Sequence, residues 1–98
     1  MSLLTDLQST GLPVAYRFFQ KPQATPFIVY YQTDSNNFPA DNKVYQHIMG
    51  YTIELYTDTK RPDLEALVEQ ALENYVWEKS EEYVDSEKCF EIIYDVEV

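Results

Sequence analysis

The spacing of the hydrophobic residues changes at Pro62, and this change limits the possible folds more than any other feature of the 98-residue chain. Before Pro62, residues 43–57 alternate in character, which is the period of a strand. One face of that segment consists of Tyr45, His47, Met49, Tyr51, Ile53 and Leu55. After Pro62, apolar residues recur three and four positions apart, which is the period of an amphipathic helix. That stripe consists of Leu64, Leu67, Val68, Ala71, Leu72 and Tyr75. The chain must therefore combine strands with helices.

The other segments complete the order α-β-β-β-α-β-β. We predict a short helix over Ser2–Gln8, strands over Val14–Phe19, 27–33 and 43–57, a helix from Pro62, and strands over Val76–Tyr83 and 90–98. No repeat, low-complexity stretch or linker interrupts them. These features predict a single α+β domain over residues 1–98, with an antiparallel sheet of about four to five strands and two helices packed on one face.

The composition is that of a folded protein. Hydrophobic residues make up 45% of the chain and aromatic residues 15%, which is too many for intrinsic disorder. No apolar run approaches the roughly 20 residues that span a bilayer. The N-terminal stretch lacks the basic start and the long apolar run of an export signal, so we expect a soluble protein that stays in the cytoplasm where it is made.

The net charge of −10 comes from the C-terminal third of the chain. Residues 1–62 hold five acids and five bases, whereas residues 63–98 hold twelve acids and only Lys79 and Lys88 as bases. Nucleic-acid affinity depends on lysine and arginine displacing counterions from phosphates. The distribution therefore argues against direct nucleic-acid binding, although a surface past which DNA slides without sticking is compatible with it.

The sequence predicts no catalytic residue, no cofactor and no metal. A carboxylate hydrolase holds two carboxyls at a fixed separation in a cleft, one of them with a raised pKa. Most acids here stand at the polar positions of a helix or a strand, which predicts solvation instead. A cysteine nucleophile needs a base, and nothing in the sequence brings Cys89 and His47 together. His47 also has no second histidine or cysteine at metal-ligand spacing.

A polar loop, SNNFPADNKVYQ at residues 35–46, separates the two segments that are most typical of strands. This loop lacks the central glycine and the final glutamate of a twelve-residue calcium loop, so turn formation is favoured over metal binding. The candidate oxygen donors are Asp34, just before the loop, and Asn36, Asp41 and Asn42 within it. Phe38 has no apolar neighbour within the loop. Its ring either folds back onto the sheet or docks into a partner.

The helix from Pro62 carries a row of acids outside its apolar stripe. Glu65, Glu69 and Glu73 follow one another at i, i+4 and i+8, a like-charge spacing that costs roughly 0.2–0.5 kcal/mol per pair. No lysine within the helix relieves this repulsion. We expect these three acids on the outer, solvated face of the helix.

Four stretches of the sequence resemble the small head–tail joining and tail-terminator proteins of long-tailed bacteriophages and prophages, especially those of Gram-positive hosts. They are LPVAYRFF, PFIVYYQTDSNNFPADNKVY, YTIELYTDTKRPDLEALVEQAL and FEIIYDVEV. The resemblance extends over residues 12–98. Its most specific part is YYQTDSNNFPADNKVY with the following ELYT.

The resemblance implies a structural protein, not an enzyme, that forms a ring, commonly a hexamer, at the head-proximal end of the tail or at the joint below the portal. Its partners would be further copies of itself and the phage tail-tube and head-completion proteins. Specific nucleic-acid binding and membrane binding are not expected. The protein would occupy the host cytoplasm during assembly and the head–tail junction of the virion afterwards.

A closed ring requires two different surfaces on every subunit. The polar loop is one candidate, with the interface residues Asn36, Asn37, Phe38, Pro39, Asp41, Asn42 and Tyr45. Exposed strand edges are the other candidate, because they can pair with a neighbour's sheet. The acidic residues Glu65, Glu69 and Glu73 would line the channel, where negative charge limits the sticking of passing DNA.

An alternative function is that of a small acidic inhibitor or DNA mimic that binds a basic partner. The net charge of −10 fits this function as well. A mimic, however, is expected to spread its carboxylates over both halves of its surface. It would also remain a monomer, whereas a ring component can oligomerise.

Overall fold

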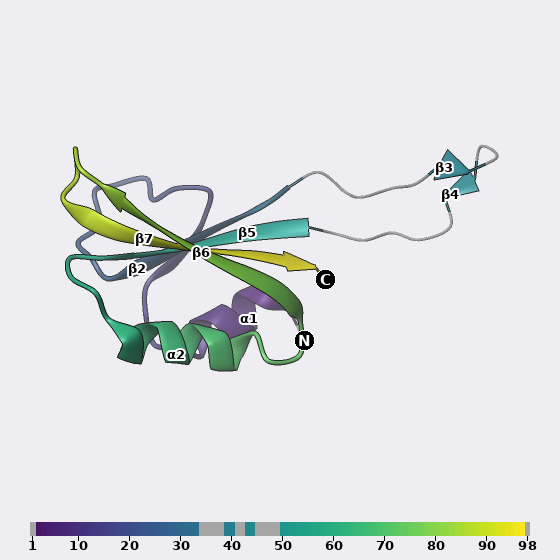
Figure 1. The fold of residues 1–98 in the computed structure, drawn as a ribbon, viewed down its shortest axis with the longest axis horizontal. Coiled ribbons are helices and arrows are strands. Elements are labelled where there is room, and N and C mark those ends of the chain that lie inside the picture. Colours follow the sequence, from purple (N-terminus) through teal and green to yellow (C-terminus); the bar gives the residue numbers. More distant parts are fainter. Residues whose placement is uncertain (1, 34–38, 41–42, 45–49, 98) are drawn as a thin grey trace.

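The computed structural model describes residues 2–33, 39–40, 43–44 and 50–97, and it shows an α+β fold in the predicted order (Figure 1). The helices are α1 (Leu3–Gln8) and α2 (Pro62–Ala71). The strands are β1 (Val14–Tyr16), β2 (Phe27–Gln32), β3 (Pro39–Ala40), β4 (Lys43–Val44), β5 (Gly50–Thr57), β6 (Val76–Val84) and β7 (Cys89–Glu97). The predicted strand over 43–57 is thus described as β4 and β5, and residues 45–49, with Tyr45, His47 and Met49, lie outside the described residues.

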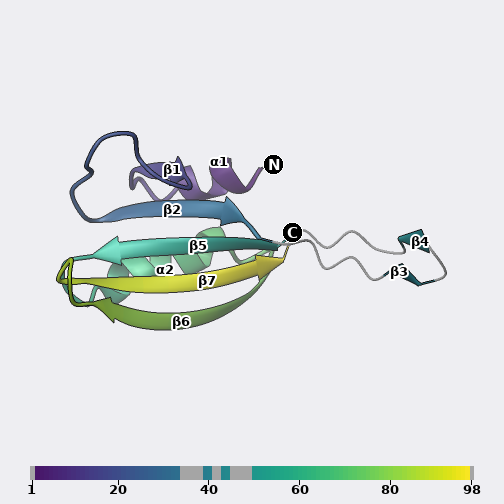
Figure 2. The same ribbon diagram turned by 90° about the horizontal axis from the view of Figure 1, so that it is seen from above.

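The main sheet has five strands in the order β1-β2-β5-β7-β6, as Figure 2 shows from above. Neighbouring strands are antiparallel except for β1 and β2, which run parallel. The predicted antiparallel sheet is confirmed for the other neighbouring strands, and the β1–β2 pair is the exception. Parallel neighbours need a connection that returns along the sheet, and residues 17–26, called here the connector, make that return.

Both helices cover one face of the sheet, so the sheet has a covered face and an open face (Figure 1). Alternation along each strand decides which residues face the helices. The fully buried side chains on the covered face include Ile28 of β2, Ile53 and Leu55 of β5, and Ile92 and Tyr94 of β7. These residues form one core with the buried side chains of the helices.

The helices contribute the buried residues Leu3, Leu7, Leu64, Val68 and Leu72. Two leucines of the predicted apolar stripes are more exposed than expected: Leu4 is 37% exposed and Leu67 is 41% exposed. α1 begins where the Ser2 hydroxyl accepts a hydrogen bond from the Thr5 amide at 3.1 Å. A covered face with two short helices therefore buries only one side of each helix.

A hydrogen bond joins the α1 side of the core to the segment after α2. The Tyr75 hydroxyl donates to Oδ2 of Asp6 at 2.5 Å. This bond, together with burial, raises the pKa of Tyr75 to about 12. Asp6 of α1 is therefore bonded to Tyr75, in the segment that leads into β6.

Among the described strands, β3 and β4 pair with each other alone, antiparallel, and form a small separate sheet. Figures 1 and 2 show them away from the main sheet, beyond the end where β2 finishes and β5 begins. β2 and β5 themselves pair antiparallel from Phe27 with Tyr56 to Gln32 with Tyr51. The predicted hairpin between these strands is confirmed.

No helix in the described part of the chain is long and apolar enough to cross a membrane.

Candidate interaction surface

The residues predicted for the interface lie mostly outside the described residues. This holds for Asn36, Asn37, Phe38, Asp41, Asn42 and Tyr45. Pro39 is described by its backbone alone, in β3 opposite Val44. Their role in an interface therefore stays a prediction. The surfaces that the structure describes are the two faces and the two edges of the main sheet.

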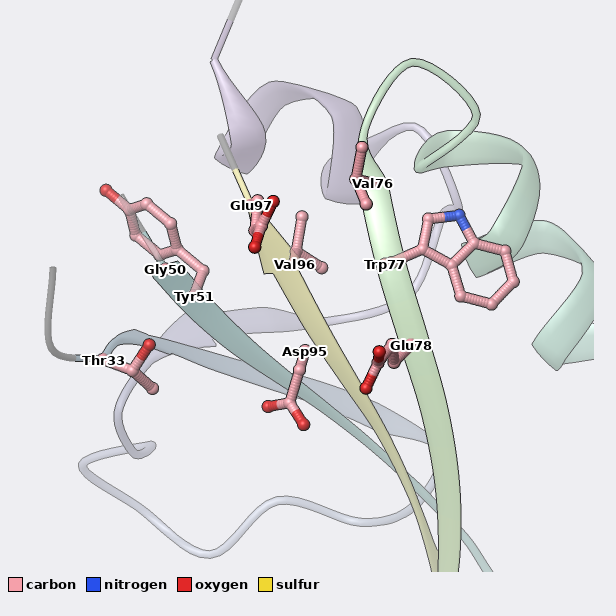
Figure 3. A pocket seen from close by; sticks show the side chains of 9 residues that line it. All are labelled: Thr33, Gly50, Tyr51, Val76, Trp77, Glu78, Asp95, Val96 and Glu97. Carbon is pink, nitrogen blue, oxygen red and sulfur yellow. The ribbon is translucent and has the colours of Figure 1, made fainter. Parts of the chain in front are cut away.

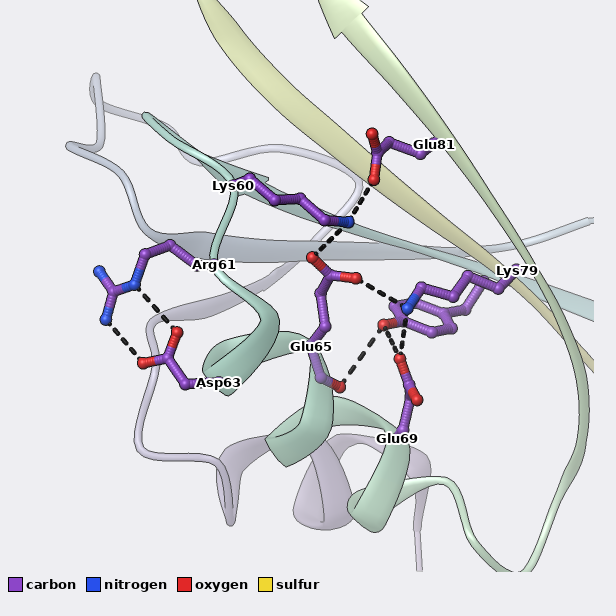
Figure 4. A network of polar contacts seen from close by, with 8 residues as sticks. Lys60, Arg61, Asp63, Glu65, Glu69, Lys79 and Glu81 are labelled. Atoms are coloured by element: carbon purple, nitrogen blue, oxygen red, sulfur yellow. Dashed lines mark hydrogen bonds and ion pairs between the residues drawn. The ribbon is translucent and has the colours of Figure 1, made fainter.

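The acids of α2 form a network with lysines that come from outside the helix (Figure 4). Glu65 is only 4% exposed, and its two carboxylate oxygens lie 2.8 Å from Nζ of Lys60 and 2.7 Å from Nζ of Lys79. Lys79, which belongs to β6, also contacts Oε2 of Glu69 at 2.7 Å. The Tyr94 hydroxyl donates to the same Glu69 oxygen at 2.9 Å. Lys60 reaches Glu81 of β6 as well.

The prediction that Glu65 stands on a solvated outer face is therefore wrong. Burial disfavours its ionised form, but the hydrogen bonds from Lys60 and Lys79 outweigh this effect and hold the pKa of the Glu65 carboxyl below its usual range. Glu69 is half-buried, and Glu73 is exposed as expected. The physical reason is that Lys60, just before α2, and Lys79 of β6 both lie beside the Glu65–Glu69 row of the helix.

The open face of the sheet holds acids opposite acids. In the β6–β7 ladder Glu78 is the partner of Asp95, and Glu82 is the partner of Glu91. Like charges directly opposite each other on neighbouring strands destabilise a sheet. Among the residues that the structure describes, neither Glu78 nor Glu82 makes an ion pair.

A cavity of about 430 Å³ lies at the end of this acidic surface (Figure 3). Among the described residues its lining includes the acids Glu78, Asp95 and Glu97 and no base. Figure 3 shows Glu78 and Asp95 on neighbouring strands, while Trp77 points the other way, towards α2. The side chain of Asp95 accepts a hydrogen bond from the Thr52 hydroxyl at 3.1 Å.

Two carboxyls of the open face share one phenol. The Tyr56 hydroxyl lies 2.9 Å from Oε1 of Glu54 and 2.9 Å from Oε2 of Glu91. A hydroxyl has one hydrogen and can donate to one carboxylate at a time, so Tyr56 satisfies only one of the two carboxyls at any moment. Burial and the neighbouring Glu54 carboxyl raise the pKa of Glu91. Glu54 and Glu91 thus place two carboxyls close together on the open face, and neither has an ion pair among the described residues.

A tight turn at Arg17 ends β1. Arg17 has a φ of 68°, and the Phe18 amide donates to the Tyr16 carbonyl at 2.8 Å, which closes a three-residue turn. A positive φ is uncommon for arginine and costs of order 1–3 kcal/mol. The guanidinium lies 5.7 Å from the ring centroids of both Tyr16 and Tyr31. The turn thus directs a cation onto the aromatic part of the open face.

An aromatic cavity of about 460 Å³ lies between the connector and the open face. Its apolar walls include Phe18, Phe19, Phe27 and Tyr56. Phe27 stacks on Tyr56 with 4.9 Å between ring centroids and meets the edge of Phe19 at 5.4 Å. Arg17, Lys21 and Glu54 are its charged lining residues. A few polar groups around apolar walls are typical of a binding site.

The described residues offer little support for a catalytic or metal site. Cys89 is buried, and burial followed by nearby acids raises the pKa of its thiol, which disfavours a reactive thiolate. No three His, Cys, Asp or Glu side chains of the described part are arranged to hold a metal ion. His47 lies outside the described residues.

Sequence reasoning missed the acid pairs of the open face and the aromatic cavity. The alternation of residues 90–98 placed Glu91 and Asp95 on one side of a strand, but only the register shows that Glu82 and Glu78 lie opposite them. The cavity depends on the connector returning over the open face, which periodicity does not encode. The one available signal was the aromatic cluster of FF at residues 18–19 beside two bases.

The fold of the whole chain is similar to that of one chain in a solved structure described as "Virion of native gene transfer agent (GTA) particle". The TM-score is 0.67, the sequence identity is 11%, and the alignment covers 99% of this chain and 91% of that chain. No protein-family model and no curated protein matches the sequence. The similarity shows that the two chains share a fold.

Proposed function

We propose that this protein is a non-enzymatic structural component of a phage-like virion, which forms or joins a ring at the head-proximal end of the tail. The observation that carries the proposal is the fold match to a chain of a gene transfer agent virion, because it extends over nearly the full length of both chains. The sequence resemblance to tail-terminator and head–tail joining proteins supports the same role from the residues themselves.

The surfaces of the sheet support a docking function. One face of the sheet is left open by the helices, and it carries opposed acids at one edge and an aromatic cavity at the other. Such uncompensated charge weakens a monomer, and a partner surface of opposite charge would relieve it. The proposed partners are other copies of this chain and the phage tail-tube and head-completion proteins, first in the host cytoplasm and then at the head–tail junction.

We further propose that the segment from Asn36 to Tyr45 contacts a neighbouring subunit or the next ring, with Phe38 as its apolar anchor. The position of β3 and β4 beyond the end of the main sheet supports this proposal (Figure 1). Channel lining is proposed for Glu69 of α2 and for Glu73 just after it, since Glu65 is buried beneath two lysines.

The distribution of acids favours this role over a DNA mimic. A mimic is expected to spread carboxylates over both halves of its surface, whereas twelve of the seventeen acids lie in residues 63–98, on α2, β6, β7 and the segments between them. The other side of the sheet, at β1 and the connector, carries Arg17 and Lys21 without any acid between Asp6 and Asp34.

Deletion of the gene from a strain that produces the particles tests the proposed role. We expect electron microscopy to show filled heads separated from tails, and complementation by the wild-type gene to restore intact particles. Complementation by Phe38→Ala should fail although the purified variant keeps the circular dichroism spectrum and the melting temperature of the wild type. Intact particles without the gene would refute the virion role, and an unfolded Phe38→Ala variant would assign Phe38 to the core.

A further inference from the structure

We infer that each subunit docks the β6 edge of its sheet onto the connector of a second copy of this chain, with Glu78 and Glu82 facing Arg17 and Lys21. The inference rests on the proposed assembly function and specifies which two surfaces meet.

The two surfaces lie at opposite edges of one sheet. The strand order β1-β2-β5-β7-β6 puts the connector beside β1 and β2 at one edge and β6 at the other. A contact between them is therefore heterologous, because each copy uses one edge to bind and offers the other edge to the next copy. Heterologous contacts generate rings when the rotation closes, whereas a self-complementary patch would stop at a dimer.

The charges of the two edges are complementary. Arg17 and Lys21 are exposed, and the described part of the chain provides no ion pair to either of them. Glu78 and Glu82 face only other acids across the β6–β7 ladder. The lysine of β6, Lys79, points to the covered face and is occupied by Glu65 and Glu69. Opposite charges brought together in this way set both the partner and its register.

The connector also carries exposed apolar surface. Phe18 is 67% exposed at the mouth of the aromatic cavity. Tyr83, at the end of β6, points to the covered face like Lys79 and meets the edge of Phe90 at 5.1 Å between ring centroids, so it is not part of this contact.

β6 is an edge strand, and its outer backbone is available to a partner before assembly. β6 is nine residues long and pairs with β7 on one side, and no other strand of the described residues pairs with its outer amides and carbonyls. Charged residues along such an edge prevent indiscriminate strand pairing. Glu78 and Glu82 therefore both protect the free edge and select a basic partner surface.

A charge exchange tests the inference. Variant A carries Arg17→Glu and Lys21→Glu, and variant B carries Glu78→Lys and Glu82→Lys. Each variant alone opposes like charges, so we expect at least a tenfold weaker self-association than wild type by sedimentation velocity at equal concentration. An equimolar mixture of A and B opposes unlike charges at every contact and should recover assembly. A control with Glu73→Lys and Glu87→Lys has the same net charge as B and should assemble as wild type.

Zero-length carbodiimide cross-linking gives a readout for weak association. Wild-type protein is mixed from ¹⁴N and ¹⁵N preparations, and we expect heavy–light peptides that join Lys21 to Glu78 or Glu82. Cross-links between Lys79 and Glu69 within one copy serve as the internal positive control. If these form while no heavy–light Lys21 peptide appears, the inference is overturned.

The two proposals fail separately. If A and B assemble as well as wild type, or if their mixture recovers nothing, the edge-to-connector contact is wrong and the virion role stands. If the protein is absent from purified particles, the virion role is wrong whatever the cross-links show. Circular dichroism of A, B and the control confirms that each is folded before it is scored.

Discussion

The covered face and the open face of the sheet hold their acids in different ways. On the covered face, Glu65 and Glu69 lie beside Lys79, and Lys60 joins Glu65 to Glu81. On the open face, Glu78 lies opposite Asp95, and Glu82 lies opposite Glu91. The same strand, β6, contributes to both arrangements, because its alternate residues point to opposite sides.

The covered face therefore holds the ion pairs that stabilise the subunit, whereas the open face holds the charges that are available to other subunits. Ion pairs that are partly withdrawn from water hold α2 on the sheet. Opposed carboxylates on the open face have no such partner within the described residues, and they cost stability in the isolated subunit. The open face is therefore the better candidate for contacts that form during assembly.

Removal of the buried acid should have the largest effect. We expect Glu65→Ala to lower the free energy of unfolding by about 2 kcal/mol at pH 7, less than the roughly 3–5 kcal/mol for a fully buried pair, because Lys60 and Lys79 stay partly in water. Since the folded-state pKa of Glu65 is lowered, its contribution is complete above the ordinary glutamate pKa and is lost as the pH falls through the lowered value. Urea unfolding of the wild type and the variant between pH 2 and pH 7 measures the loss of stability and its dependence on pH.

Glu73→Ala is the matched control for this experiment, because Glu73 is an exposed acid of the segment that follows α2. It should change the free energy of unfolding by no more than about 0.5 kcal/mol. Equal effects of the two substitutions would show that Glu65 is not held by its lysines.

Loss of a hydroxyl on the covered face should have the next largest effect. Tyr94→Phe removes the hydrogen bond that the buried phenol donates to Glu69, and we expect it to cost about 1–2 kcal/mol, because the acceptor is charged. Tyr31→Phe removes the contact at 3.3 Å to Glu54 on the open face and should cost less. Thermal unfolding of the two variants ranks them, and the reverse order would contradict the account of the two faces.

Neutralising an acid on the open face should stabilise the subunit slightly. We expect Glu91→Gln to raise the free energy of unfolding by about 0.5 kcal/mol at pH 7, because it removes repulsion from Glu54 and Glu82. The pKa of Glu91 is raised in the folded state, so the wild-type penalty is absent at low pH and appears as the pH rises through that value. The increase in the free energy of unfolding of Glu91→Gln over wild type should therefore disappear at low pH.

Glu87→Gln, in the turn between β6 and β7, provides the comparison for Glu91→Gln and should leave stability nearly unchanged. A loss of stability in Glu91→Gln at pH 7 would mean that its carboxylate is compensated on the open face.

The sequence predicted the elements well where one periodicity dominates. The stripe of α2 and the alternation of β5 and β7 gave the order of the elements, the hairpin of β2 and β5 and the side of the sheet that is buried. It could not predict the parallel pairing of β1, because that depends on where the connector returns. The sequence also placed Glu65 on the wrong side of the helix. Glu65 is buried because Lys60 and Lys79 contact it in the folded chain, and the sequence pattern does not show these contacts.

The most direct test of the virion role is quantitative mass spectrometry of purified particles from the strain that carries this gene. We predict that the protein co-purifies with intact particles at a fixed, ring-sized number of copies per particle, and that it is enriched in fractions of joined heads and tails over free heads. A protein that is expressed during particle production and is yet absent from intact particles would contradict the account.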